Sequence, residues 1–190
     1  MTGFDLVLLL LSFVYALALG HLLSRLGALL VARDRVRFSG LLALAMLNAV
    51  TQVYIGWLAM WDFRDVESWD LYTITLFLLS AILIYLMCVA ASPETPDNEP
   101  VDMEAFYWSN HRLFYGLYLG LLGTYIAMTA VYLMTPTPEL AVQQSLGNVP
   151  FILTSLLAIF ISARWAQWMA GLLMFFMSAG WAIIFSHTLG

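Results

Sequence analysis

Apolar residues fill six long stretches of this chain, and short polar segments separate them. The stretches cover residues 4–32, 38–61, 71–91, 113–134, 141–163 and 165–185. Each is close to the roughly 20 residues that an α-helix needs to cross a bilayer. They are apolar on all sides, whereas the strands of a membrane barrel alternate apolar and polar residues in pieces of ~10 residues. The pattern therefore predicts an all-α bundle of six transmembrane helices in a single domain, 1–190.

The composition agrees with a chain surrounded by lipid. Hydrophobic residues make up 63% of the 190 positions and charged residues 10%, against about 45–50% and about 25% in an average soluble domain. We therefore expect the bilayer to be the main partner of the chain. The sequence has no basic patch of the kind that binds nucleic acid, so we expect no nucleic-acid partner.

Arginine placement predicts the topology. Arginines occur between the first and second stretches, before the fourth, and between the fifth and sixth: Arg33, Arg35, Arg37, Arg112 and Arg164. With six crossings these positions fall on one side of the membrane, and Arg64 falls on the other. Because basic residues favour the cytoplasmic side, both termini are expected outside the cytoplasm.

The longest polar segment lies between the third and fourth stretches. Residues 92–101 are acidic and proline-rich, which predicts a flexible linker on the cytoplasmic side. Asp102 follows as a predicted helix N-cap. Residues 103–111 then form either a short surface helix or the first turns of a long fourth helix.

The fifth stretch is interrupted at its start. Gly147 and Pro150 disfavour an unbroken helix, and Gln143 and Gln144 are poor residues for a membrane interior. The segment is expected to be a kinked span or a partly re-entrant one. With five spans instead of six, the C-terminus would lie in the cytoplasm.

Polar side chains within the first two stretches form the candidate site. His21 and Arg25 lie one turn apart on one helix, and Asn48, Thr51 and Gln52 share a face of the next. In an antiparallel pair that turns near residue 35, His21 and Asn48 lie at equal depth, which predicts a hydrogen bond between them. Two interpretations are open: a structural polar contact that sets helix register, or a site for a polar solute or proton in which His21 titrates.

Small residues recur at four-residue spacing on two helices. Gly20 and Ser24 belong to such a row in the first stretch, and Gly116 and Gly120 in the fourth. Small residues let helix backbones approach closely in lipid. The rows predict close packing within the chain or, alternatively, the seam of a homo-oligomer.

Several classes of chemistry lack the residues they need. The chain has no lysine, so amine nucleophiles, Schiff bases and Walker-type phosphate loops are excluded. Its single cysteine, Cys88, is expected to be a small apolar core residue. No spacing of histidine, cysteine and carboxylate suggests a metal or haem site. We therefore predict no catalytic residue, no cofactor and no metal.

One part of the chain has a familiar arrangement. The segment from Leu83-Ile-Tyr-Leu to Pro93, the acidic linker, and Phe106-Tyr-Trp-Ser-Asn-His-Arg-Leu-Phe-Tyr together resemble small inner-membrane proteins of proteobacteria. The resemblance implies six helices in a bacterial inner membrane. It implies no activity and no site residue.

These observations favour a non-enzymatic integral membrane protein. The leading function is a small channel or transporter with a polar site between the first two helices. The alternative is a structural or assembly subunit of a larger membrane complex, which would dock through its small-residue faces and acidic loop.

Overall fold

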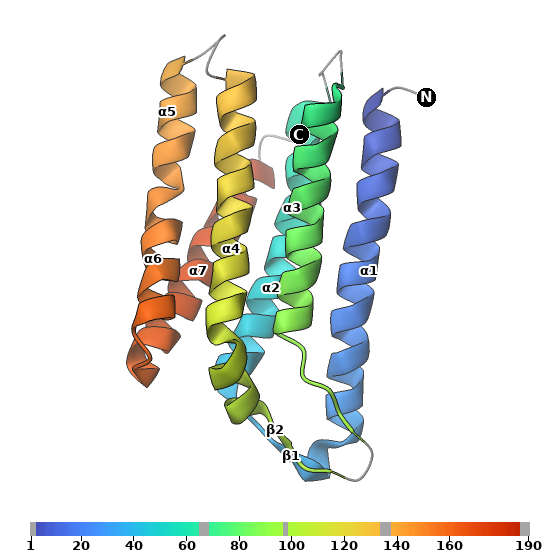
Figure 1. The fold of residues 1–190 in the computed structure, drawn as a ribbon, viewed down its shortest axis with the longest axis vertical. Coiled ribbons are helices and arrows are strands. Elements are labelled where there is room, and N and C mark those ends of the chain that lie inside the picture. Colours follow the sequence, from blue (N-terminus) through green and yellow to red (C-terminus); the bar gives the residue numbers. More distant parts are fainter. Residues whose placement is uncertain (1–2, 65–68, 97–98, 134–137, 187–190) are drawn as a thin grey trace.

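The protein folds as a bundle of helices (Figure 1). The computed structural model describes residues 3–64, 69–96, 99–133 and 138–186. In chain order its elements are α1 (Gly3–Val31), η1 (Arg33–Arg35), β1 (Val36–Arg37), α2 (Gly40–Leu58), η2 (Ala59–Phe63), α3 (Leu71–Ala90), β2 (Val101–Asp102), α4 (Met103–Leu133), α5 (Pro138–Gly147), α6 (Val149–Phe160) and α7 (Arg164–Ser186). The described residues contain six helices long and apolar enough to cross a membrane. The predicted all-α class and the predicted membrane-spanning length of the helices are therefore confirmed.

The predicted boundaries agree with the structure except in the second half of the chain. The first three stretches correspond to α1, to α2 with η2, and to α3. The fourth helix begins at Met103 rather than at residue 113, so residues 103–111 are the first turns of α4 and not a separate surface helix. The apolar stretch begins only at residue 113 because the side chains in these first turns of α4 are amphipathic.

Asp102 starts α4 as predicted. Its Oδ1 atom accepts hydrogen bonds from the backbone N–H groups of Glu104 and Ala105, each at 2.9 Å. The bond from Ala105 is the largest cause of a pKa below the ordinary value for the Asp102 carboxyl, and the neighbouring Arg37 guanidinium contributes further. Two N–H groups that the helix itself cannot satisfy are thereby paired.

The fifth span consists of two helices. Helix α5 ends at Gly147 and α6 begins at Val149, with Pro150 in its first turn, where a missing N–H costs nothing. Figure 1 shows α5 continuing into α6 in the same general direction. Together the two helices provide a segment, Ala141–Phe160, that is long and apolar enough to cross a membrane.

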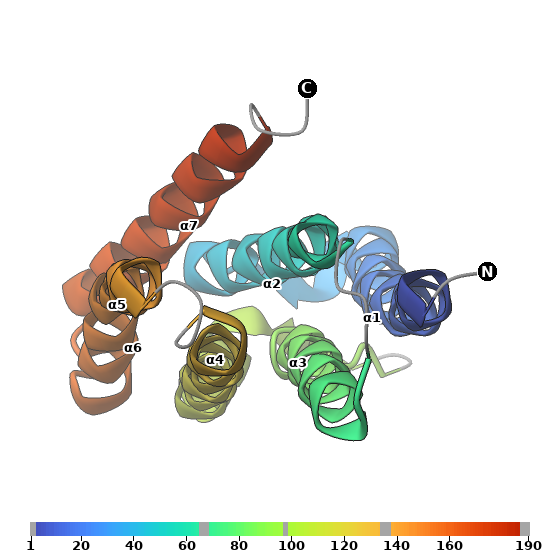
Figure 2. The same cartoon turned by 90° about the horizontal axis from the view of Figure 1, so that it is seen from above.

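Helix α2 lies in the middle of the bundle (Figure 2). It packs on α7 at one side and on α1 and α3 at the other, while α4 packs on α3 and α6. In its most apolar 18-residue window 67% of the residues are buried, against 17% for Ala141–Phe160. A side chain on α2 therefore faces a neighbouring helix at most positions.

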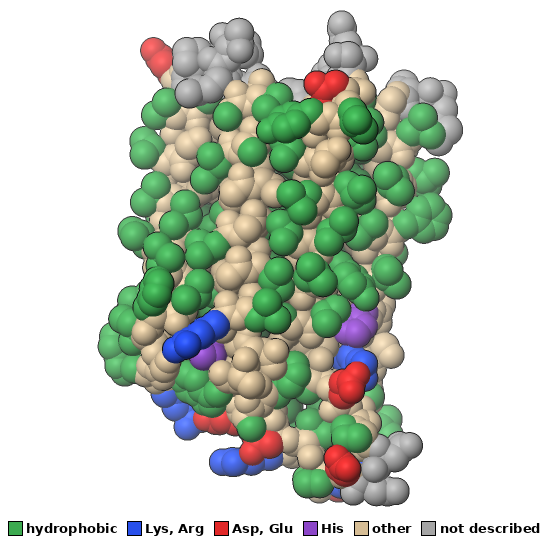
Figure 3. Space-filling view, viewed as in Figure 1, with side chains coloured by type: hydrophobic (Ala, Val, Ile, Leu, Met, Phe, Trp, Pro, Cys, Tyr) green, Lys and Arg blue, Asp and Glu red, His purple; other side chains and the backbone are tan. Residues whose placement is uncertain are grey.

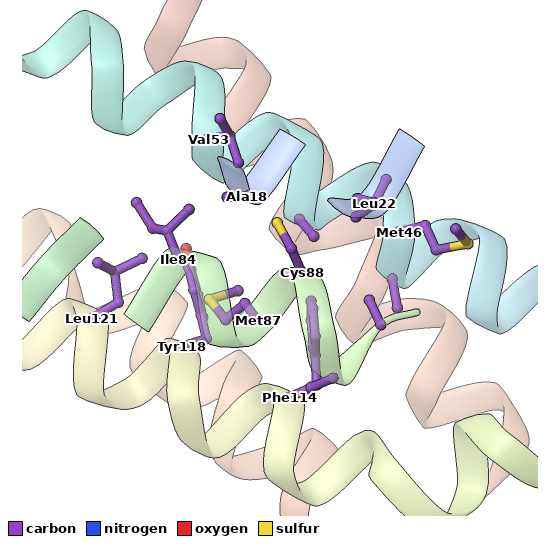
Figure 4. Close-up of a cluster of buried hydrophobic side chains, with 14 of the residues drawn as sticks. Ala18, Leu22, Met46, Val53, Ile84, Met87, Cys88, Phe114, Tyr118 and Leu121 are labelled. Carbon is purple, nitrogen blue, oxygen red and sulfur yellow. The ribbon is translucent and has the colours of Figure 1, made fainter. Parts of the chain in front are cut away.

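The core is a set of tightly packed apolar side chains between α1, α2, α3 and α4 (Figure 4). Ala18, Ile84, Met87 and Leu121 have no exposed surface, and neither does Cys88, which has the predicted core position. In lipid, where burial from water drives little, such contacts stabilise the bundle through dispersion and close packing.

Charged side chains gather at one end of the bundle, the lower end in Figure 3. We call it the arginine-rich end, because the 33–37 loop with Arg33, Arg35 and Arg37 lies there. There β1 pairs with β2 in parallel, Val36 with Val101 and Arg37 with Asp102. The end that carries the connection from η2 to α3 is called the opposite end.

The segment 92–101, predicted as a flexible linker, makes defined contacts in its described parts. Arg25 Nη2 lies 3.1 Å from Glu94 Oε1, and Arg37 Nη1 lies 2.9 Å from Asp102 Oδ2. Arg35 Nη1 donates to the carbonyl oxygens of Pro96 and Glu99. The segment thus lies against α1 and the 33–37 loop.

Candidate functional site

Two of the predicted polar residues of α2, Asn48 and Gln52, face α7 rather than α1. Asn48 Nδ2 donates to the carbonyl oxygens of Leu44 and Gly171, each at 3.0 Å. Gln52 Nε2 donates to Ser178 Oγ at 3.0 Å. Both amides are almost completely buried. They connect the central helix to the last one, a contact that the sequence analysis did not predict.

His21 does not hydrogen-bond to Asn48. The imidazole lies beside the Tyr85 ring of α3, with 6.1 Å between the ring centroids. The His21 Nε2 and Asn48 Oδ1 atoms are both buried and have no hydrogen-bond partner among the described residues. The predicted depth rested on the helical rise, but the direction of each side chain depends on how the helices are rotated. Here His21 faces α3 and Asn48 faces α7.

Arg25 and Thr51 also lie apart from a common site. Arg25 pairs with Glu94, and its side chain is 32% exposed. Thr51 Oγ1 donates to Leu47 O of its own helix at 2.9 Å. The five residues of the predicted site, His21, Arg25, Asn48, Thr51 and Gln52, therefore do not surround one cavity.

The small-residue rows are turned outward for the most part. A Cβ atom at Gly20 or Gly116 would meet nothing within 4 Å, and at Gly120 it would only touch Leu83 at 3.6 Å. Ser24 is exposed. Close packing within the chain through Gly20, Ser24 and Gly116 is thus wrong, and the homo-oligomer seam stays a prediction.

Other glycines permit the close approaches, and the two tightest lie on α2 and α7. At Gly171 a Cβ would lie 2.6 Å from Leu44 Cδ2, and at Gly56 it would lie 2.7 Å from Ile84 Cδ1. Neither glycine belongs to a small-residue row at four-residue spacing. Their role follows from which helices meet, namely α2 with α7 and α2 with α3.

A row of tyrosines on α4 is the feature that the sequence analysis missed. Tyr107, Tyr115, Tyr118 and Tyr125 are separated by eight, three and seven residues, which places them on one side of a helix. We call these four the tyrosine row. It runs along α4 from the arginine-rich end toward the opposite end. This helical spacing of amphipathic side chains was the available signal.

At the arginine-rich end the tyrosine row meets Gln167 of α7. The Tyr107 hydroxyl donates to Gln167 Oε1 at 2.7 Å, and Gln167 Nε2 donates to Ala158 O and Ile161 O, each at 2.7 Å. Gln167 is completely buried. It satisfies carbonyl groups at the C-terminal end of α6, which the helix cannot pair by itself.

In the middle of the bundle the row meets the polar contacts of α2. The Tyr118 hydroxyl interacts with Ser178, the residue that accepts from Gln52. Tyr115 lies beside Gly171, whose carbonyl accepts from Asn48. Polar groups of α2, α4 and α7 thus meet over about two helical turns in the middle of the bundle.

Toward the opposite end the row reaches a cavity of about 120 Å³. We call it the tyrosine cavity. Its polar lining consists of Tyr15, Ser80, Tyr125, Thr129 and Gln144, from α1, α3, α4 and α5. Phe63, Phe77 and Met128 contribute apolar surface, and Gly56 and Ala59 complete the lining. Among the described residues no aspartate, glutamate, arginine or histidine lines it.

The polar groups of the tyrosine cavity differ in how they are satisfied. Ser80 Oγ donates to Phe77 O at 2.7 Å, and the Tyr15 hydroxyl interacts with Ser80. The Tyr125 hydroxyl is buried without a hydrogen-bond partner in the described structure. Less than 1 Å² of its oxygen is accessible, so this hydroxyl does not open into the space of the cavity.

The part of the chain that the structure describes contains no group of three or more histidine, cysteine or carboxylate side chains able to hold a metal ion. His111 is buried beside Tyr107 and Trp108, and its Nδ1 lies 2.9 Å from Trp108 O. The third histidine, His187, lies outside the described residues. No family model, curated protein or solved structure matches this chain.

Proposed function

We propose that the protein is a non-enzymatic integral membrane protein of the channel or transporter class, and that the tyrosine cavity is its solute site. The observation that carries this proposal is the cavity of about 120 Å³ with five polar side chains in its lining, inside a bundle of apolar helices. The residues predicted to form a site between α1 and α2 face different neighbours and therefore do not support a solute site there.

The solute of this proposal is small and uncharged. An ion that entered the cavity would lose its water without meeting an opposite charge, which costs several kcal/mol. A neutral solute would need only the hydroxyl and amide groups of the lining.

The proposed topology has six crossings with both termini outside the cytoplasm. Arginines support this orientation, because the 33–37 loop, Arg112 and Arg164 belong to one end of the helices and Arg64 to the other. The tyrosine cavity then belongs to the non-cytoplasmic half of a bacterial inner membrane. The resemblance to proteobacterial inner-membrane proteins supports the choice of membrane.

Solute permeability tests the proposal. Purified protein is reconstituted into liposomes, and uptake of glycerol or urea is followed by stopped-flow light scattering. We expect faster uptake than in protein-free liposomes. Ala59→Leu, which adds volume to the cavity lining, should reduce the excess uptake about tenfold.

The matched control is Ala16→Leu, on an exposed position of α1 outside the lining. It should leave uptake unchanged. Permeability equal to that of protein-free liposomes, or an equal loss in both variants, would overturn the proposal.

The second candidate function is a subunit of a larger membrane complex. The open space at Gly20 and Gly116 favours it, because a partner helix could pack closely there. Purification in mild detergent with mass measurement tests this candidate. A larger assembly that Gly20→Leu disrupts would support it, and a monomer would exclude it.

A further inference from the structure

Arg112 differs from the other arginines at its end of the bundle, because its charge is not matched within the chain. Arg25, Arg37 and Arg164 are paired with carboxylates, and Arg35 donates to backbone carbonyl oxygens. Arg112 is exposed and has no hydrogen-bond or ion-pair partner among the described residues. A guanidinium stays charged at any physiological pH, so this one is available to an anion from outside the chain.

The position of Arg112 along α4 brings it into the part of the helix that faces lipid. The ion pair between Glu104 and Arg164, at 3.2 Å, marks the level at which α7 begins. Arg112 follows Glu104 by eight residues, which is about 12 Å at a rise of 1.5 Å per residue. Helical side chains point toward the N-terminus of their helix, so the guanidinium extends back toward the arginine-rich end. Its charge is thereby directed at the layer in which lipid phosphates lie.

Glycines continue the side of α4 on which Arg112 lies. Gly116, Gly120 and Gly123 follow at spacings of four, four and three residues, and all three are exposed. A Cβ at Gly116 or Gly123 would meet nothing within 4 Å, and at Gly120 it would only touch Leu83 of α3. Figure 3 shows a strip without hydrophobic side chains, drawn tan, along the position of α4. We call these three glycines the glycine face, and it leaves room for an extended hydrocarbon chain against the helix backbone.

The surroundings of Arg112 favour an anionic headgroup over a zwitterionic one. Helices α3 and α6, which pack against α4, contain no charged residue. Glu104 is the carboxylate that α4 itself carries, and it is paired with Arg164. A phosphate would therefore meet an unpaired cation here, whereas an ammonium headgroup would meet no unpaired carboxylate on these helices.

We infer that Arg112 and the glycine face bind an anionic phospholipid, with its phosphate at the guanidinium and one acyl chain along the three glycines. The inference goes beyond the proposed function and does not depend on the tyrosine cavity. A second copy of this chain is a poorer occupant. In a two-fold dimer across this face, the two Arg112 side chains would lie at the same depth and repel each other.

Native mass spectrometry of the intact protein tests the inference. The protein in detergent is titrated with phosphatidylglycerol and, separately, with phosphatidylethanolamine of the same chain length. We expect the lower Kd for phosphatidylglycerol. Arg112→Gln should raise that Kd about five- to tenfold, because it removes the cation from the phosphate. Arg33→Gln is the matched control, since Arg33 is exposed at the same end but lies in the 33–37 loop, and it should leave the Kd unchanged.

Gly116→Leu tests the contact with the acyl chain. Its side chain would cover the glycine face and should raise the Kd by a similar factor. Gly20→Leu changes an equally open glycine on α1 and should leave the Kd at the wild-type value. Glycerophosphoglycerol, which has the headgroup but no acyl chain, should not displace the lipid at equal concentration.

The remaining outcomes would overturn the inference. An unchanged Kd in folded Arg112→Gln protein would do so, as would equal affinity for the two lipids. Displacement by glycerophosphoglycerol would leave a small phosphate ester as the ligand. A lipid-free dimer that Gly116→Leu dissociates would place a second copy on the glycine face instead. Circular dichroism and a monodisperse elution profile establish folding for each variant.

Discussion

Buried amide side chains hold particular helices together in this bundle. Asn48 and Gln52 connect α2 to α7, and Gln167 connects α7 to α4 and to the end of α6. In lipid a buried polar group has no water to bond, so an unmatched amide is costly. These residues therefore select one packing of α7 among several that apolar contacts alone would allow.

Replacing Asn48 by leucine tests the contact between α2 and α7. Asn48→Leu removes both hydrogen bonds that the Asn48 side chain donates, to Leu44 O and Gly171 O, so the free energy of unfolding should fall by about 0.6–1.7 kcal/mol. Unfolding in mixed micelles by SDS titration measures it. Thr51→Val is the matched control, because Thr51 bonds only to its own helix, and it should be close to neutral. Equal losses in the two variants would contradict the role of Asn48.

Gln167 should be the more sensitive position. Gln167→Leu leaves the Tyr107 hydroxyl and two carbonyl groups unpaired, which should lower the free energy of unfolding by about 1–3 kcal/mol. Tyr107→Phe should cost less, because it leaves Gln167 bonded to α6. In a double-mutant cycle the two changes should be non-additive, since they remove one shared hydrogen bond. Additive losses would mean that the two side chains stabilise the bundle independently.

Individual helices are defined by local signals as much as by packing. Asp70 caps α3, its side chain accepting from Thr73 N at 2.7 Å, and Asp102 caps α4 in the same manner. Bonding to Thr73 lowers the pKa of the Asp70 carboxyl, and bonding to Ala105 lowers that of Asp102. Both caps are thus strongest when the carboxylate is ionised.

The cap of α4 should weaken in acid. Because the folded-state pKa of Asp102 is below its unfolded value of about 3.9, its stabilising contribution is complete above that pH. It is lost as the pH falls through the lowered folded-state pKa. Hydrogen exchange at the Glu104 and Ala105 amides, corrected for intrinsic rates, should show protection that declines only in that acidic range.

Asp102→Asn separates the cap from its charge. Asparagine also caps helices, so protection of the Glu104 and Ala105 amides should persist in this variant and lose its pH dependence. Asp102→Ala should lose protection at every pH. A wild-type pH profile retained in Asp102→Asn would assign the effect to another group.

The whole molecule combines a packed half and a less packed half. Helices α1 to α4 enclose the core of Figure 4, whereas α5 and α6 are largely exposed and α7 extends away from the bundle in Figure 2. Charges lie mainly at the arginine-rich end (Figure 3). Because the two ends differ in charge, they are expected on different sides of the membrane, and labelling at each end can determine the orientation of the chain.

Single cysteines in a Cys88→Ala background report the orientation. We expect an impermeant maleimide to label Glu139→Cys, in α5, in intact spheroplasts, and to label Glu94→Cys, at the arginine-rich end, only after lysis. Both side chains are exposed. The reverse pattern would invert the topology, and labelling of both positions from one side would contradict six crossings. Native Cys88 should react only after denaturation, because it is completely buried.

The sequence by itself determined the helical class and most helix boundaries, because apolar length and N-cap residues such as Asp102 act locally. It also determined the break near Pro150, where the proline ring fixes φ and favours the start of a new helix. It did not determine which helices meet. His21 and Asn48 were placed at equal depth, but the rotation of each helix is set by contacts far along the chain, such as Gly171 with Leu44. Only the tertiary structure brought Tyr15, Ser80 and Tyr125 around one cavity, because packing, and not spacing along the chain, decides which faces of α1, α3 and α4 converge.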